Sequence, residues 1–284
     1  MTDHRHHARH DHAHATHQDH LPELLDLDAE VLADTVREIH DEIERLADRP
    51  IRTIIDIGAG TGTGTIGLLR RFTDAHAVAI DASEEMLGHV ADRAAELGLA
   101  DRVTTQRADL DTGVPAMAPV DLAWASASLH HLAAPDRTLR ELVGAIRPGG
   151  LLAVVELTGF PRFIADGTPG ADAEARVHAL LASDRAADMP AMGADWGAQL
   201  ERAGLVVETR RAIDIDLAPP LPPAAGRYAA ASLTRTAQAV ADRLDPADRA
   251  TLGTLLDSGP HDVRRRSDLR VTTTRWSWVA RRPV

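Results

Sequence analysis

Short apolar runs and helical stripes alternate along the chain. The runs at 51–57 and 151–157 are rich in β-branched residues or leucine, which is typical of strands buried in a parallel sheet. Before the first run, apolar residues recur every three or four positions from Leu32 to Leu46, so they lie on one face of a helix. The pattern therefore predicts a helix over 22–48, ended by Pro50, followed by a buried strand.

The same alternation continues to the end of the chain. It predicts further strands at 77–81, 103–107, 120–125, 205–217 and 269–281, and further helices after 64 and at 83–98, 135–146 and 194–203. A repeated strand–helix order predicts an α/β fold, in which a mostly parallel sheet carries helices on both faces. The last strand alternates apolar and polar residues, as a more exposed strand does.

Three segments fall outside this repeat. Insertions such as 158–193 and 218–268 usually lie at the ligand-binding rim of an α/β sheet, so we expect both to cap a substrate. Residues 1–20 hold eight of the fifteen histidines without apolar periodicity, and we predict a disordered tail followed by one domain over 21–284. Imidazoles bind metals, but we favour a mobile tail with incidental affinity and predict no fixed metal site, because a fixed site needs a folded second shell.

The composition excludes several enzyme classes. The chain has no cysteine, which excludes thiol nucleophiles, cysteine-bound zinc and iron–sulfur clusters. All 31 basic residues are arginine, so neither a Schiff-base lysine nor a phosphate-binding P-loop is possible. The net charge of -12 disfavours a nucleic-acid partner and suits a small substrate. We expect no membrane segment and, without an apolar leader stretch, a cytoplasmic protein of unknown oligomeric state.

The central motif is a glycine-rich turn between the first strand and its helix. Asp56 ends the strand, and Gly58, Gly60 and Gly62 follow at alternate positions. Glycines let the backbone turn tightly and approach a ligand, and ligands bind at the carboxyl ends of such strands. Asp81 ends the second strand and can accept both hydroxyls of a ribose, while Asp109 follows the third and can accept from an adenine amine.

This series of motifs resembles that of the class I S-adenosylmethionine-dependent methyltransferases, of the small-molecule type. The resemblance covers residues 50–157 well, including the segment 121–132 and the Arg147–Gly150 turn, and is looser over 194–217 and 269–282. It implies a Rossmann-like sheet of seven strands with the last one antiparallel. It also implies that 50–157 is the cofactor-binding half and that 22–48 is an N-terminal lid helix.

The resemblance also implies a set of cofactor-binding residues. The glycine loop would hold the methionine part of S-adenosyl-L-methionine, Asp81 the ribose and Asp109 the adenine amine. Small and apolar residues from the three strand ends would pack against the adenine and the loop. The complete set is Asp56, Gly58, Ala59, Gly60, Gly62, Asp81, Ala82, Met86, Ala108, Asp109, Leu110 and Ala125.

The competing cofactor is NAD, because Gly62, Gly64 and Gly67 spell the GxGxxG of dinucleotide sites. In such a site the first glycine follows the strand closely, whereas Gly62 comes five residues after Ile57. The last two glycines would therefore lie inside the helix, which disfavours a nicotinamide oxidoreductase.

Methyl transfer needs a general base only when the acceptor must lose a proton. His130 and His131, just beyond the fourth strand, are the candidate catalytic residues, although the same stretch can be a packing element. Glu156 is a second candidate base, or it caps a backbone amide. Trp124 and Trp196 could line a pocket, but core packing is the commoner fate of tryptophan.

The sequence is compatible with two functions of different classes. We expect methyl transfer to a small-molecule acceptor, whose O, N or C nucleophile the sequence does not reveal. The segment 125–128 departs from the pattern of enzymes that methylate amino groups of bases or glutamine. The alternative is a non-catalytic cofactor-binding or regulatory protein on the same fold.

Overall fold

The computed structural model describes residues 21–188 and 191–284, so the predicted histidine-rich tail lies outside the described residues. The described chain divides into two compact units. The larger unit comprises Leu32–Pro161, 182–188, 191–216 and Thr272–Val284. The smaller comprises 21–31, Arg162–Leu181 and Leu217–Val271. The prediction of one domain over 21–284 with two caps stays a prediction.

The sheet has the predicted α/β arrangement. Its strands are β1 (Thr53–Ile57), β2 (His76–Asp81), β3 (Val103–Arg107), β4 (Val120–Ser126), β5 (Ile146–Leu157), β6 (Arg162–Ile164), β7 (Val206–Leu217) and β8 (Leu269–Arg281). The order is β3-β2-β1-β4-β5-β8-β6, and β7 also pairs with β8. The first five strands run parallel and β8 runs antiparallel to β5, which confirms a Rossmann-like, mostly parallel sheet with an antiparallel last strand.

Three details differ from the sequence prediction. The sheet has eight strands rather than seven, because the three-residue β6 joins it from a segment predicted as an insertion. β5 begins at Ile146 rather than 151, since Ile146 pairs with Val120 before a shift in register. The single helix predicted over 22–48 is two helices, α2 (Leu21–Val31) and α3 (Ala33–Leu46), because the backbone of Leu32 leaves helical geometry.

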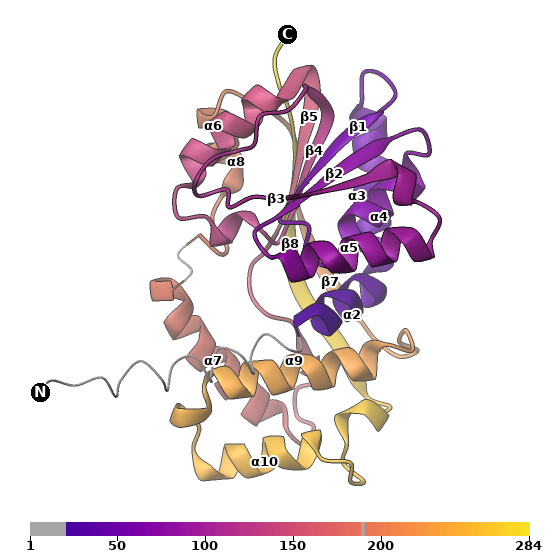
Figure 1. The fold of residues 1–284 in the computed structure, drawn as a ribbon. Coiled ribbons are helices and arrows are strands. Elements are labelled where there is room, and N and C mark those ends of the chain that lie inside the picture. The colour runs from indigo at the N-terminus through magenta and orange to yellow at the C-terminus, as the bar shows by residue number, and fades with distance from the viewer. Residues whose placement is uncertain (1–20, 189–190) are drawn as a thin grey trace, which may run out of the picture. The chain divides into compact units, whose positions relative to one another are not determined.

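Four of the remaining helices in the described chain follow strands as predicted, and three lie in the two segments predicted as insertions. They are α4 (Thr63–Arg71), α5 (Glu84–Glu96), α6 (Pro135–Ala145), α7 (Ala171–Asp188), α8 (Trp196–Arg202), α9 (Ala225–Ala239) and α10 (Pro246–Leu256). In the larger unit, α3, α4 and α5 cover one face of the strands while α6 and α8 cover the other (Figure 1). None of the helices in the described part of the chain is long and apolar enough to cross a membrane.

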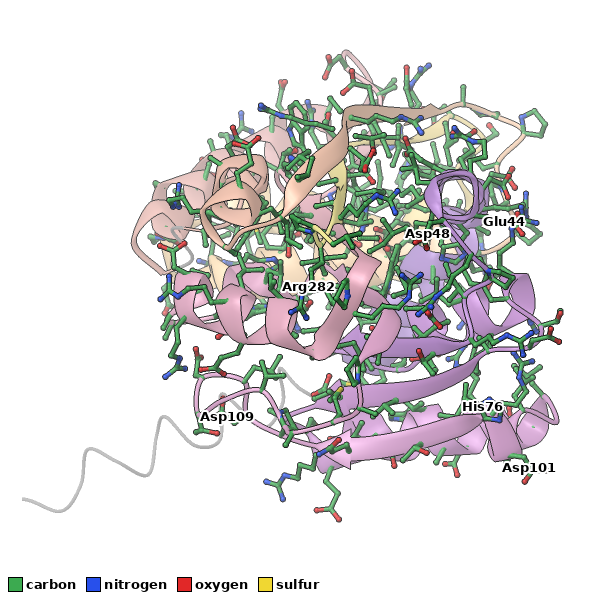
Figure 2. All side chains as sticks on the ribbon, turned by 90° about the horizontal axis from the view of Figure 1, so that it is seen from above. Glu44, Asp48, His76, Asp101, Asp109 and Arg282 are labelled. Atoms are coloured by element: carbon green, nitrogen blue, oxygen red, sulfur yellow. The ribbon has the colours of Figure 1, made fainter. Side chains whose placement is uncertain are left out.

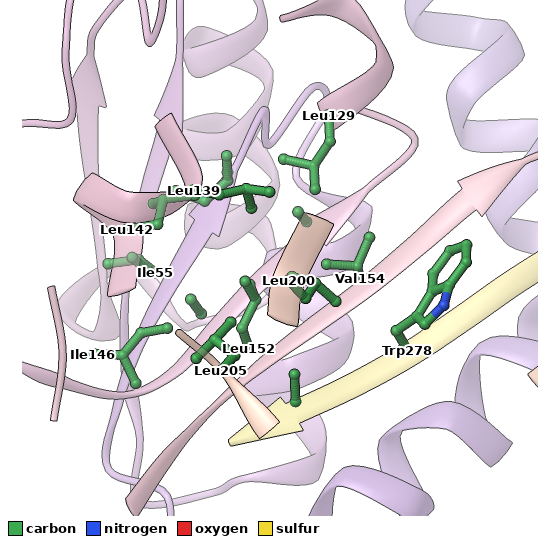
Figure 3. Packing of buried hydrophobic residues seen from close by; sticks show 14 of the residues in the cluster. Ile55, Leu129, Leu139, Leu142, Ile146, Leu152, Val154, Leu200, Leu205 and Trp278 are labelled. Carbon is green, nitrogen blue, oxygen red and sulfur yellow. The ribbon is translucent and has the colours of Figure 1, made fainter. Parts of the chain in front are cut away.

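Two apolar layers hold the larger unit together. Leu139 and Leu142 of α6 and Leu200 of α8 pack on Leu152 and Val154 of β5 (Figure 3). In the opposite layer, α3 and α4 pack against the other face of β1, β4 and β5. Because both faces of the central strands are covered, their carboxyl ends form a fixed edge on which loops can hold a ligand.

The smaller unit is built from α2, α7, α9 and α10. Glu174 of α7 is fully buried and its two carboxylate oxygens accept hydrogen bonds from the backbone N–H groups of Phe163 and Ile164. Burial raises the pKa of Glu174 above its ordinary range. Arg176 of α7 donates to Asp248 of α10 over 2.6 Å, and so ties the two predicted cap segments to each other.

Candidate functional site

The glycine loop folds over the end of β2. The backbone N–H groups of Gly58 and Ala59 both donate to the carbonyl of Ile80, over 2.9 and 3.0 Å. Gly58, Gly60 and Gly62 have φ angles of 67°, 52° and 81°, in the left-handed region that favours glycine. The three glycines are therefore required by the shape of the loop that joins β1 to α4.

Asp81 ties the loop to the next strand end. One carboxylate oxygen accepts from the backbone N–H of Gly60 over 2.9 Å, and the other accepts from that of Ser83 over 2.9 Å. The carbonyl of Asp81 accepts from the N–H of Ala108 over 3.0 Å. The structure thus brings together the ends of β1, β2 and β3, which the sequence placed at one edge of the sheet.

Asp56 lies behind the loop rather than on its surface. Its side chain is buried, with a relative exposure of 2%, and it accepts a hydrogen bond from the Thr65 hydroxyl over 2.6 Å. Burial raises the pKa of Asp56 to about 7, and the charge of Asp81 raises it too, against the opposing hydrogen bond from Thr65. Asp56 therefore holds the start of α4 beneath the loop, and any effect it has on a cofactor passes through the backbone.

The pKa of Asp56 predicts a pH-dependent stability. Because the folded-state pKa of about 7 exceeds the ordinary carboxyl pKa of 3.8, the protonated Asp56 stabilises the fold below about pH 4, and this stabilisation is lost as the pH rises through 7. A shift of this size corresponds to about 4 kcal/mol at most. In Asp56→Asn, which retains an acceptor for Thr65, we expect this part of the pH dependence to disappear.

Urea unfolding of wild type and Asp56→Asn at about pH 5 and pH 8 measures the difference. The comparison cancels other titrating groups, because both proteins contain them. Equal changes in unfolding free energy for the two proteins between these pH values would show that Asp56 titrates normally.

The residues predicted for the adenine are open to solvent or half-buried. Ala82 and Asp109 are exposed, and Met86, Ala108 and Leu110 are half-buried. One oxygen of Asp109 accepts from the N–H of Asp111 over 2.9 Å, which shapes the turn after β3. Figure 2 shows Asp109 at the end of the sheet opposite His76 and Asp101. Asp109 is thus on the same edge as the glycine loop, and its adenine role stays a prediction.

The end of β4 closes the other side of the glycine loop. Ala125 is fully buried and its side chain belongs to the core, so only backbone atoms near it could reach a cofactor. Ala127 has a φ of 51°, uncommon for a residue with a Cβ, and such strain is frequent at functional sites. The hydroxyl of Ser128 donates to the carbonyl of Ile57 over 2.7 Å. The sequence did not single out Ser128 as the residue that meets Gly58.

His130 and Glu156 form a buried pair. The Nδ1 atom of His130 lies 2.6 Å from one carboxylate oxygen of Glu156, and the other oxygen accepts from the N–H of Leu129 over 2.8 Å. Both side chains have a relative exposure of 3% or less. His131 is exposed, with its ring centroid 4.1 Å from that of His130.

The sequence indicated both members of this pair without joining them. The available signal was their position at the ends of β4 and β5, since consecutive strands of such a sheet are often neighbours. Between the two candidate histidines, the structure gives the enclosed, oriented position to His130.

The later glycines serve helix packing. Gly64 and Gly67 lie inside α4, as the sequence predicted. This position disfavours a dinucleotide-binding loop. A Cβ at Gly64 would lie 2.8 Å from the indole nitrogen of Trp124, and one at Gly67 would lie 2.9 Å from the ring of His40. Burial lowers the pKa of His40 to about 4, so this ring is neutral. The GxGxxG spacing is therefore explained by close approach between α4 and its neighbours.

The two tryptophans considered for the pocket are core residues. Trp124 is 2% exposed and Trp196 is fully buried. They belong to the two opposite apolar layers of the larger unit. Both tryptophans therefore pack in the core, which the sequence analysis gave as the alternative to lining a pocket.

Comparison with known proteins finds sequence similarity over the first five strands of the sheet. Residues 54–150 match the family described as "Methyltransferase domain". The trans-aconitate 2-methyltransferase of Azoarcus sp. is 37% identical over 118 residues, which is 42% of this chain and 44% of that protein. The 27-O-demethylrifamycin SV methyltransferase of Amycolatopsis mediterranei is 33% identical over 126 residues, 41% of this chain and 45% of that protein.

A solved structure resembles this chain in fold over most of its length. A candidate sarcosine dimethylglycine methyltransferase from Galdieria sulphuraria superposes with a TM-score of 0.54 at 16% identity, covering 88% of this chain and 86% of that one. The sequence matches span less than half the length of the curated relatives. Residues 54–150 are therefore similar to a methyltransferase domain, and the likeness in fold extends over most of the chain.

Proposed function

We propose that the protein is an S-adenosyl-L-methionine-dependent methyltransferase that acts on a small molecule. The observation that carries the proposal is the contact between the Gly60 N–H and the Asp81 carboxylate, which joins the glycine loop to the acid at the end of β2. A nucleoside cofactor needs both features together, a close backbone approach and an acid for the ribose. The methyltransferase match over 54–150 supports the same assignment.

The residues at this edge fit the cofactor. A Cβ at Gly58 would overlap Ser128 at 2.5 Å, so the loop has room only for backbone on that side. Asp81 is half-buried and Ala82 exposed, which leaves the carboxylate reachable by ribose hydroxyls. We assign Gly58, Gly60 and Gly62 to the methionine part, Asp81 to the ribose and Asp109 to the adenine amine.

The cofactor supplies an electrophilic methyl group when bound. The glycine loop and Asp81 would hold and orient the cofactor at this edge of the sheet. Alignment of donor and acceptor is a main source of acceleration in such a displacement.

A small acceptor suits the relatives and the charge. The two curated relatives are named for methylation of trans-aconitate and of a demethylrifamycin, both small molecules. The net charge of -12 disfavours a nucleic-acid substrate. We further propose a cytoplasmic location, which suits a chain without cysteine.

The proposal is tested by calorimetric titration with S-adenosylhomocysteine, the demethylated product, and in parallel with NADH. We expect saturable binding of the first at micromolar order and none of the second. Binding of NADH alone would favour an oxidoreductase instead.

A further inference from the structure

An acid outside the predicted site residues connects two turns at the carboxyl edge of the sheet. Asp111 lies in the turn after β3, shortly beyond Asp109, and is half-buried. One of its carboxylate oxygens accepts hydrogen bonds from the backbone N–H groups of Ala133 over 2.9 Å and of Ala134 over 3.3 Å. The turn after β3 is thereby attached to the segment that connects β4 to α6.

The backbone of Asp111 orients Asp109. Its N–H donates to one carboxylate oxygen of Asp109 over 2.9 Å. The carbonyl of Asp109 in turn accepts from the N–H and the hydroxyl of Thr112, over 2.9 and 2.7 Å. Because a carboxylate accepts at both oxygens, fixing one oxygen also fixes where the other lies. Under the proposed function, the other oxygen would accept from the adenine amine.

The start of α6 reinforces the attachment between the two turns. Arg137 in its first turn donates to the backbone carbonyl of Asp111, and the Thr138 hydroxyl donates to that of Leu110 over 3.2 Å. Leu110 and Leu132, one from each turn, pack against the same apolar layer. The turn after β3 therefore cannot shift without breaking contacts with α6.

The N-cap of α6 has no side-chain acceptor of its own. The position is taken by Ala134, and Pro135 follows. Helices commonly have Ser, Thr, Asp or Asn there, whose oxygen accepts from backbone N–H groups, and a negative charge at this end is also favourable. Asp111 supplies an acceptor and a charge from 23 residues away in the chain. The acceptor at this helix start is therefore part of the turn that holds Asp109.

We propose that Asp111 is a positioning residue that couples occupancy of the adenine site to the backbone of the turn after β4. This inference rests on the proposed function, in which Asp109 accepts from the adenine amine. A bound amine restrains Asp109 and, through the contact with the N–H of Asp111, restrains the carboxylate that holds Ala133 and Ala134.

The turn that Asp111 holds carries both candidate catalytic residues. His130 and His131 lie between the end of β4 and Ala133. Alignment of groups contributes to the rate of a reaction, so a turn that becomes more ordered when adenine is bound favours reaction with the complete cofactor. Because coupling between two sites is reciprocal, loss of the contact with Ala133 and Ala134 is expected to weaken adenosine binding as well.

The first test uses two nucleosides that differ in one group. Adenosine carries the exocyclic amine and purine riboside lacks it, so only adenosine can donate to Asp109. In titrations of the full-length protein followed by NMR, we expect Asp111→Ala to bind adenosine about tenfold more weakly than wild type and purine riboside with equal affinity. A merely structural loss at the turn would weaken binding of both nucleosides alike.

Two variants serve as controls for the hydrogen bond and for the charge. Asp111→Asn keeps an acceptor for the N–H of Ala133, and we expect it to recover most of the affinity for adenosine. Asp136→Ala removes an exposed acid in the first turn of α6, whose partner is Arg202 of α8 at 3.3 Å. We expect this variant to bind adenosine as wild type does, although it also lacks a negative charge at the helix start.

Amide hydrogen exchange measures the coupling in the wild type itself. We expect saturating adenosine to slow exchange at Ala133 and Ala134 at least about fivefold, and saturating purine riboside to leave it unchanged. In Asp111→Ala, exchange at the same amides is expected to be faster and insensitive to adenosine. Because the two nucleosides are compared on the wild type, this measurement decides the question even if Asp111→Ala does not fold.

Three results would overturn the inference. They are an unchanged adenosine affinity in folded Asp111→Ala, an equal loss for both nucleosides, and exchange at Ala133 and Ala134 that adenosine does not slow. If the wild type does not bind S-adenosylhomocysteine, the methyltransferase proposal fails and the inference fails with it. If it binds S-adenosylhomocysteine but gives one of these three results, only the coupling through Asp111 is wrong.

Discussion

Replacement of Asp81 by alanine is expected to weaken binding of S-adenosylhomocysteine at least about a hundredfold. A hydrogen bond to a charged group contributes about 1.5–3 kcal/mol, and Asp81 is proposed to accept two from the ribose, so the loss is about 3–6 kcal/mol. The substitution also removes the acceptor of the Gly60 and Ser83 N–H groups, which loosens the glycine loop. Isothermal titration calorimetry of the variant measures the loss.

Two further variants separate these contributions. Asp81→Asn keeps an oxygen for the Gly60 N–H but lacks the charge, so an intermediate affinity is expected. Asp101→Ala removes an exposed acid before β3, at the opposite end of the sheet from Asp109 (Figure 2), and is expected to bind as wild type does. If Asp81→Ala bound with wild-type affinity and remained folded, the ribose could not be at Asp81.

Replacement of Gly58 by alanine is expected to destabilise the fold by about 2–5 kcal/mol. A Cβ in the left-handed region costs about 1–2 kcal/mol, and overpacking costs a further 1–3 kcal/mol or so. The overlap here is with Ser128, whose Cβ would lie 2.5 Å from the new atom. Because the loop and the β4 end meet at this contact, we also expect weaker cofactor binding.

Gly98→Ala is the matched control for this prediction. Gly98 has a φ of 68°, against 67° for Gly58, but a Cβ there would meet nothing within 4 Å. It is therefore expected to show the backbone cost alone, about 1–2 kcal/mol. In the double variant Gly58→Ala/Ser128→Gly, the steric part should be recovered. Equal unfolding free energies for Gly58→Ala and Gly98→Ala in urea would mean that the loop is free of Ser128.

The sequence predicts those features of the candidate site that depend on local patterns. A parallel α/β sheet places consecutive strand ends on one edge, so the sequence alone predicts that Asp81 lies beside the glycine loop. The position of Gly64 and Gly67 within a helix followed from the distance between Gly62 and β1. These inferences needed only strand boundaries and residue types.

Other features depend on contacts between distant residues or on very short elements. The break at Leu32 has no glycine or proline to mark it, and the three residues of β6 are too few to form a pattern. The contact of His130 with Glu156 joins residues 26 apart through the register of β4 and β5. The inward turn of Asp56 toward Thr65 likewise depends on where α4 begins.

We propose that the edge formed by the glycine loop, Asp81 and Asp109 binds S-adenosyl-L-methionine. Calorimetric titration of the wild type with S-adenosylhomocysteine, with NADH in a parallel cell and Asp81→Ala as the negative control, tests it most directly. We predict saturable binding of S-adenosylhomocysteine at micromolar order, none of NADH, and at least about hundredfold weaker binding by the variant. Absence of binding by the folded wild type, or binding of NADH in its place, would contradict this assignment of the cofactor.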